Sequence, residues 1–106
     1  MGTAHEGQVV VVTGAGRGIG RAIAERFAGA GAHVVVNDID ADVVAEVVDH
    51  ILSAGGTAAG AVADVSDSAQ VASIFDTALD AYGTVDVLVN NAGIVSPMLH
   101  FFEADE

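Results

Sequence analysis

Cysteine, tryptophan and lysine are absent from the sequence, and proline occurs once in 106 residues. Without cysteine the chain cannot be a disulfide scaffold, and with 5% aromatic residues its core must be built from smaller side chains. Such side chains are abundant, because 52% of the residues are hydrophobic and most of these are alanine or valine. This much buriable surface excludes a disordered chain, and the length allows a single domain.

Positive charge is also scarce, since 15 acidic residues and three arginines give a formal net charge of -12. A polyanion such as nucleic acid would be repelled, and the sequence has no basic stripe that could overcome the repulsion. Anionic membrane surfaces are disfavoured for the same reason. We therefore expect neither nucleic acid nor a membrane as a partner.

Targeting, membrane and metal signals are not apparent in the sequence. Residues 1–7 lack the basic start and long apolar stretch of a signal peptide. The valine run at 9–12 is far shorter than the roughly 20 residues that span a bilayer. The histidines follow no metal-ligand spacing. The sequence predicts a cytoplasmic protein without a metal site.

Strand-like and helix-like segments alternate along the chain. Continuous β-branched runs predict strands buried on both faces, and helical spacing of apolar residues predicts the helices between them. The order βαβαβαβ with right-handed crossovers gives an α/β fold with a parallel sheet and helices on both faces. The expected strands are 9–12, 33–36, 58–63 and 85–89. The expected helices run from Gly18 to the glycines at 29 and 31, from about Asp42 to Ser53, and from Ser66 or Asp67 to Gly83.

The spacing also identifies an apolar face on each helix. The first helix presents Ile19, Ala22, Ile23, Phe27 and Ala30, the second Val44, Val47, Val48 and Ile51, and the third Val71, Ile74, Phe75, Ala78 and Tyr82.

The whole chain, 1–106, is interpreted as one incomplete domain. Residues 1–7 form a leader, and residues 94–106 form an irregular tail without a complete element. A sheet that stops after four strands leaves its fourth strand as an uncovered edge. We therefore expect self-association or a partner chain at that edge.

Four glycines fall within seven residues between the first strand and the first helix, in the string TGAGRGIG (13–20). Glycine permits a tight turn, lets the backbone approach a phosphate, and leaves the amides at the helix start free to bind it. The spacing TGxxxGIG differs from GxGxxG, and no Gly-Lys-Ser/Thr follows, which excludes a P-loop. The loop predicts a pyrophosphate site at the start of the helix.

Asp38 ends the second strand, 18 residues beyond Gly20, where a carboxylate can accept hydrogen bonds from the hydroxyls of an adenosine ribose. A 2′-phosphate near Asp38 would meet its negative charge, at a cost of about 4 kcal/mol per charge at ~4 Å and an effective dielectric of ~20 before screening. Arg17, inside the loop, favours the opposite choice, because it could pair with a 2′-phosphate. We give the carboxylate more weight and expect NAD rather than NADP.

Together with VVVNDID (34–40), ADVSD (63–67) and NNAG (90–93), the glycine loop resembles the short-chain dehydrogenase/reductase family in order and spacing. The resemblance covers about residues 8–96. It implies a Rossmann-like, doubly wound parallel sheet, here ending after the fourth strand. It also implies an NAD(P)-dependent oxidoreductase that interconverts small alcohols and carbonyls by hydride transfer.

The resemblance also implies roles for individual residues. Gly14, Arg17, Gly18, Ile19 and Gly20 would hold the pyrophosphate side of the dinucleotide. Asp38 would bind the adenosine ribose, and Asp64 with Val65 the adenine. Asn90, Ala92 and Gly93 would supply ribose and central-sheet contacts.

The catalytic groups of that family cannot be placed in this sequence. The resemblance implies a tyrosine and a lysine spaced YxxxK, with a serine and an asparagine. The only tyrosine, Tyr82, is followed four residues later by Asp86, and there is no lysine. We therefore predict no catalytic residue in this chain and no activity of the chain alone.

Two other interpretations stay open. The missing tyrosine–lysine pair also fits a non-catalytic, nucleotide-binding remnant. The spacing Gly14-x-Gly16-x-Gly18, followed by an acid after the second strand, also resembles methyltransferases that use S-adenosylmethionine, although NNAG is then unexplained.

Overall fold

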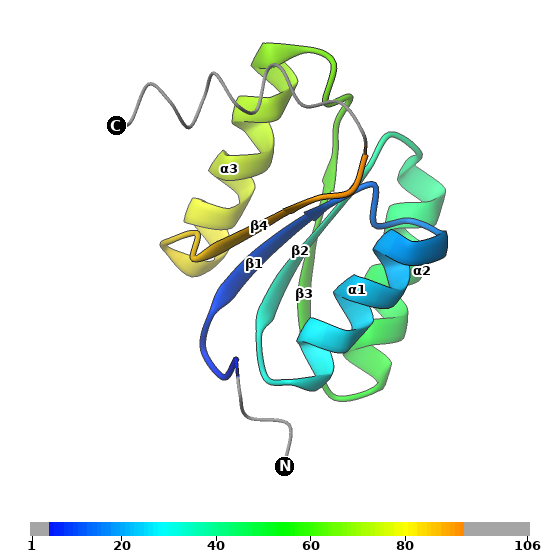
Figure 1. The fold of residues 1–106 in the computed structure, drawn as a ribbon, viewed down its shortest axis with the longest axis vertical. Coiled ribbons are helices and arrows are strands. Elements are labelled where there is room, and N and C mark those ends of the chain that lie inside the picture. The colour runs from blue at the N-terminus through cyan, green and yellow to red at the C-terminus, as the bar shows by residue number, and fades with distance from the viewer. Residues whose placement is uncertain (1–4, 93–106) are drawn as a thin grey trace.

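The computed structural model of the chain describes residues 5–92, which form a four-stranded parallel sheet between two layers of helices (Figure 1). The order of the strands in the sheet is β3-β2-β1-β4. The elements are β1 (Val9–Thr13), α1 (Gly18–Gly29), β2 (His33–Asp38), α2 (Ala41–Ser53), β3 (Thr57–Val62), α3 (Ser68–Tyr82) and β4 (Val87–Asn90). The predicted α/β class, element order and parallel sheet are confirmed.

The valine runs of β1 and β2 form the centre of the sheet, and alternate side chains point to opposite faces. Val10, Val12, Val34 and Val36 pack under α1 and α2 on one face. Val9, Val11 and Val35 pack against α3 on the other. Because both faces are covered, these valines are almost completely buried, which explains why the two strands are uninterrupted apolar runs.

Local signals in the sequence set the ends of the helices. The side chain of Asp40 accepts hydrogen bonds from the backbone N–H groups of Asp42 and Val43 at the start of α2, and Asp67 caps α3 in the same way. Gly83, with φ +85°, ends α3 in the left-handed conformation. The described helices include none that is long and apolar enough to cross a bilayer.

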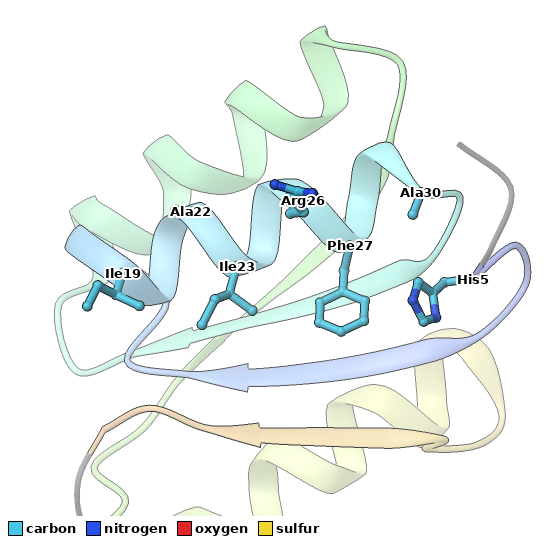
Figure 2. Close-up of a pocket in the computed structure, with 7 residues that line it drawn as sticks. All are labelled: His5, Ile19, Ala22, Ile23, Arg26, Phe27 and Ala30. Carbon is cyan, nitrogen blue, oxygen red and sulfur yellow. The ribbon is translucent and has the colours of Figure 1, made fainter. Parts of the chain in front are cut away.

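The face that α1 turns to the sheet differs from the prediction. Its buried residues are Gly20, Ala24 and Ala28, whereas Ile19 is 73% exposed. Ala22 is exposed as well, and Ile23 and Phe27 are only half-buried. Small residues occupy the sheet-facing side of α1 because they let the helix axis approach β1 and β2 closely. The stripe of bulky residues therefore lies on the flank of α1 (Figure 2).

Candidate cofactor-binding site

The carboxyl ends of all four strands meet at one edge of the sheet, where β1 lies between β2 and β4 and the strand order reverses. Ligands of open α/β sheets bind in the crevice at such a point. The edge holds a hollow of about 260 Å³. Its lining residues are Gly14, Asn37, Asp38, Ile39, Ala63, Asp64, Val65 and Ala92. Five of them were predicted as site residues: Gly14, Asp38, Asp64, Val65 and Ala92.

The glycine loop leaves β1 and enters α1 through two left-handed residues, Gly14 (φ +62°) and Gly18 (φ +63°). At Gly16 a Cβ atom would lie 2.7 Å from Oδ2 of Asp38, and at Gly20 it would overlap the carbonyl oxygen of Gly14. A side chain at Gly20 would displace the backbone of the loop, whereas one at Gly16 would displace the side chains of Asp38 and Val43. Both positions therefore favour glycine.

The start of α1 is electrostatically unlike the starts of the other two helices. Arg17 is its N-cap, with extended backbone and no side-chain hydrogen bond to the helix, and the first turn holds no acid. The side chain of the N-cap therefore does not accept hydrogen bonds from the backbone N–H groups of the first turn. The positive end of the helix dipole is also not neutralised by a carboxylate. This end of α1 has the chemistry of an anion site.

Asp38 lies at the end of β2 beside the glycine loop. Its Oδ2 accepts a hydrogen bond from the backbone N–H of Gly16 at 3.0 Å, and its Oδ1 accepts from that of Ile39 at 2.8 Å. Arg17 points to a different carboxylate, with Nη2 3.5 Å from Oδ2 of Asp40, in an exposed ion pair. Exposed pairs of this kind contribute about 0–1 kcal/mol, so a stronger anion can displace Asp40.

Asn37 holds the site together, and sequence reasoning assigned it no role. The residue is 1% exposed. Its Nδ2 donates to the carbonyl oxygens of Ala61 at 2.9 Å and Ala63 at 3.2 Å, and its Oδ1 accepts from the N–H of Gly14. One amide therefore joins β2, the end of β3 and the glycine loop. The signal in the sequence was a polar residue that directly follows a run of buried valines.

Thr13 connects the loop to β4 and was likewise missed as a site residue. Its buried Oγ1 accepts hydrogen bonds from the backbone N–H groups of Asn91 at 3.0 Å and Ala92 at 3.2 Å. The same hydroxyl lies 3.2 Å from Oδ1 of Asn90, to which it donates. The Nδ2 of Asn91 in turn donates to the carbonyl oxygen of Gly14 at 3.2 Å. The glycine loop is thus tied to Asn90, which ends β4, and to Asn91, which follows it.

We expect a Thr13→Val variant to lose about 2 kcal/mol of the free energy of unfolding, because two backbone N–H groups lose a buried acceptor while the shape is kept. Urea denaturation measures the loss, and hydrogen exchange should show faster exchange at Asn91 and Ala92. Thr77→Val on α3 is the matched control, since Thr77 only donates back to the carbonyl of Ser73. Equal losses in the two variants would contradict the assigned role.

The remaining predicted residues lie around the hollow or outside the described part of the chain. Oδ1 of Asp64 accepts hydrogen bonds from the N–H and the hydroxyl of Ser66, which lowers the pKa of the Asp64 carboxyl. Ile19 begins the exposed flank of α1 rather than lining the hollow. Gly93 lies outside the described residues. Within residues 5–92 no group of three or more acidic or histidine side chains could hold a metal ion.

Comparison with protein-family models matches residues 8–106 to the short chain dehydrogenase model. Among curated proteins, the 7α-hydroxysteroid dehydrogenase of Escherichia coli is 47% identical over 88 residues, which are 83% of this chain and 34% of that enzyme. The chain thus spans about a third of the length of this curated relative.

Two solved structures show the same fold. A 7α-hydroxysteroid dehydrogenase complexed with NADH and 7-oxo glycochenodeoxycholic acid superposes with a TM-score of 0.83 and 46% identity, over 85% of this chain and 35% of that one. A metagenomic short-chain oxidoreductase in complex with NADP gives a TM-score of 0.78 and 46% identity, over 84% of this chain and 40% of that one.

Proposed function

Since the chain belongs to the short-chain dehydrogenase family, we propose that its strand-end hollow binds NAD(H) as the cofactor-binding part of an alcohol/carbonyl oxidoreductase. The observation that carries the proposal is the uncapped start of α1, which faces a loop with no room for side chains at Gly16 and Gly20. A backbone cradle of this kind fits a pyrophosphate. The family binds NAD(P), and the two solved relatives carry NADH and NADP.

Within this proposal each predicted residue keeps its role. The loop residues Gly14, Arg17, Gly18, Ile19 and Gly20 bind the pyrophosphate side. Asp38 binds the adenosine ribose, Asp64 and Val65 bind the adenine, and Asn90, Ala92 and Gly93 support the ribose and the sheet. When bound, the nicotinamide supplies the hydride chemistry, and the residues of this chain bind and orient it.

We further propose NAD rather than NADP. Asp38 lines the hollow at the end of β2, where its carboxylate would face a 2′-phosphate. Arg17 could neutralise that phosphate, because its exposed ion pair with Asp40 is weak. We give the repulsion by the carboxylate more weight, so the unphosphorylated ribose is favoured.

The test is a calorimetric titration of the chain with NADH, NADPH and S-adenosylmethionine. We expect NADH to bind at least about tenfold more tightly than NADPH, a difference of about 1.4 kcal/mol that a screened charge repulsion readily supplies. Asp38→Asn keeps an oxygen acceptor for the ribose and for the N–H of Gly16 but removes the negative charge. The preference for NADH over NADPH should therefore largely disappear. Asp49→Asn, on the exposed side of α2, changes the net charge equally and should leave it intact.

Two outcomes would overturn this assignment. A preference for NADH that survives in Asp38→Asn would remove the role of the carboxylate. Tightest binding of S-adenosylmethionine would replace the dehydrogenase interpretation by that of a methyltransferase fragment.

We also propose that this chain alone catalyses no turnover. Its single tyrosine, Tyr82, ends α3 and stacks on His33, with ring centroids 4.8 Å apart, and the sequence has no lysine to pair with it. Assays with NADH and a panel of small carbonyl compounds should give rates equal to those without protein. A rate that rises with protein concentration would refute this proposal.

We further propose that the outer edge of β4 pairs with a strand of a second copy or of a partner chain, because among the described residues β4 pairs only with β1. Sedimentation velocity over a range of concentrations tests self-association, and a mass that stays that of one chain would exclude it. The cytoplasmic location expected from the sequence stays a prediction.

A further inference from the structure

Asp64 lines the strand-end hollow just after β3, and its neighbours hold it in one position. Its backbone N–H donates to Oε1 of Gln70 at 2.8 Å, and its carbonyl oxygen accepts from the N–H of Asp67 at 3.1 Å. Oδ1 of its carboxylate accepts from the N–H of Ser66 at 2.9 Å and from the Ser66 hydroxyl at 2.7 Å. Within residues 5–92 these bonds leave Oδ2 as the polar atom of Asp64 that is still open to a ligand.

Gln70 is the third residue of α3, a position from which a glutamine side chain often bonds the N–H of the N-cap residue. In α3 the N–H of the N-cap, Asp67, donates instead to the carbonyl oxygen of Asp64. The Gln70 side chain reaches past the cap to the N–H of Asp64, and its Nε2 donates to Oδ2 of Asp67 at 3.3 Å. The start of α3 therefore fixes the backbone of Asp64 as well as its own first turn.

The hydroxyl of Ser66 does more than close a turn. The N–H of Ser66 would by itself close an Asx turn on Oδ1 of Asp64. The hydroxyl adds a second and shorter bond to the same oxygen, so the carboxylate cannot rotate without losing both bonds. Ser66 is exposed, and water could satisfy its hydroxyl, so burial does not require this contact. The contact instead fixes the direction of the carboxylate.

The same bonds keep the carboxylate of Asp64 charged. The hydroxyl and then the N–H of Ser66 lower the pKa of the Asp64 carboxyl. An ionised carboxylate only accepts hydrogen bonds, so its open oxygen attracts an amine and repels a carbonyl oxygen. Adenine carries an exocyclic amine where hypoxanthine carries a carbonyl oxygen. A charged carboxylate held in one direction can therefore distinguish the two bases.

We propose that Ser66 and Gln70 are positioning residues for Asp64, and that they make the hollow selective for adenine over purines with a carbonyl oxygen in place of its amine. This inference rests on the proposed function, in which Asp64 binds the adenine. It goes further by assigning the selectivity for the base to two residues that do not line the hollow. A carboxylate released from Ser66 can turn and accept from the ring N–H of hypoxanthine, so its selectivity falls.

Calorimetric titration of the chain with NADH and with reduced nicotinamide hypoxanthine dinucleotide tests the proposal. The unmodified chain should bind NADH at least about tenfold more tightly, because a charged acceptor loses its donor in the analogue. Ser66→Ala should reduce this ratio to about threefold or less, as expected when one hydrogen bond no longer fixes the acceptor. Ser66→Thr keeps the hydroxyl and should restore the ratio. Gln70→Met, similar in length but without the amide, should also reduce it.

Ser73→Ala is the matched control. It removes an exposed hydroxyl of α3 that donates to the backbone carbonyl of Gln70 at 2.6 Å and does not bond to Asp64. Its ratio should equal that of the unmodified chain. A loss of stability or of general affinity weakens both nucleotides together, so only the ratio reports the direction of the carboxylate. Circular dichroism checks that each variant is folded.

A second measurement needs no nucleotide. NMR titration of the carboxyl carbon of Asp64 should give a higher pKa in Ser66→Ala than in the unmodified chain, because the charged carboxylate loses the hydroxyl that stabilises it. The pKa in Ser66→Thr and in Ser73→Ala should be that of the unmodified chain.

The two measurements separate the ways in which the proposal can fail. An unchanged ratio or an unchanged pKa in Ser66→Ala would overturn the positioning role and leave the proposed cofactor site intact. Equal binding of both nucleotides by the unmodified chain would show that Asp64 does not select the base. If the unmodified chain bound neither nucleotide, the proposed function would be wrong, and the selectivity for adenine with it.

Discussion

Gly20→Ala is expected to destabilise the chain by about 3 kcal/mol, the upper end of the range for overpacked sites, and to abolish measurable NADH binding. A Cβ atom at this position would overlap the carbonyl oxygen of Gly14 and lie 2.5 Å from Nδ2 of Asn91. The Nδ2 of Asn91 donates to this carbonyl, and the N–H of Asn91 donates to Oγ1 of Thr13, the residue before Gly14, so the carbonyl cannot move without releasing these bonds. The whole glycine loop must shift to admit one methyl group.

Gly29→Ala, at the other end of the same helix, is the matched control. A Cβ atom there meets nothing within 4 Å. Because alanine is a better helix former than glycine, we expect a change between zero and a gain of about 1 kcal/mol. Urea denaturation and NADH titration of both variants give the comparison. Similar behaviour of the two would show that the contact between the helix start and Gly14 does not shape the site.

The strands and helices could be predicted because their signals are local. The valine runs marked β1 and β2, and the glycines and aspartates marked the helix ends. The strand β3, expected at 58–63, lies one residue earlier at Thr57–Val62, and β4, expected at 85–89, begins two residues later at Val87–Asn90. Asp86 explains the shift of β4, because its carboxylate accepts from the N–H of Val9 while its own N–H donates to the carbonyl of Val9. Asp86, which was expected inside the strand, thus belongs to the connection that precedes β4.

The buried face of α1 was mispredicted for a general reason. Hydrophobic spacing identifies the face with the largest apolar side chains, and on most helices this is also the buried face. On α1 the sheet contact uses Gly20, Ala24 and Ala28, which recur every four residues but add little hydrophobicity. The bulky stripe from Ile19 to Phe27 lies beside this contact, where Ile19 is exposed and Ile23 and Phe27 are half-buried.

Five residues that line the hollow could be predicted from the sequence, but the supporting residues Thr13 and Asn37 could not. Glycine spacing and the acid after β2 are visible within a few positions of sequence. Thr13 bonds to residues 77–79 positions away, and Asn37 to residues 23–26 positions away. Motif spacing cannot predict such long separations along the sequence, because they depend on which strands become neighbours in the sheet.

Asn37→Leu should reveal how much the site depends on these long-range supports. We expect a loss of about 3–4 kcal/mol in the free energy of unfolding. Leucine matches asparagine closely in size but leaves the carbonyls of Ala61 and Ala63 without their donor and the N–H of Gly14 without its acceptor, at about 1–3 kcal/mol for each buried group left unsatisfied. That loss is a large fraction of the total stability of about 5–15 kcal/mol that small domains have. Urea denaturation monitored by circular dichroism measures it.

Two further variants separate hydrogen bonding from packing. Asn91→Ala removes one exposed amide contact to Gly14 and should cost less than about 1 kcal/mol. Asn37→Asp keeps the shape but turns a donor into a second acceptor facing the two carbonyls. It should be as harmful as leucine at neutral pH and should recover part of its stability in acid, because a protonated carboxyl can donate again. Should Asn37→Asp instead be as stable as the unmodified chain at neutral pH, the amide would not be the bond that joins β2, β3 and the loop.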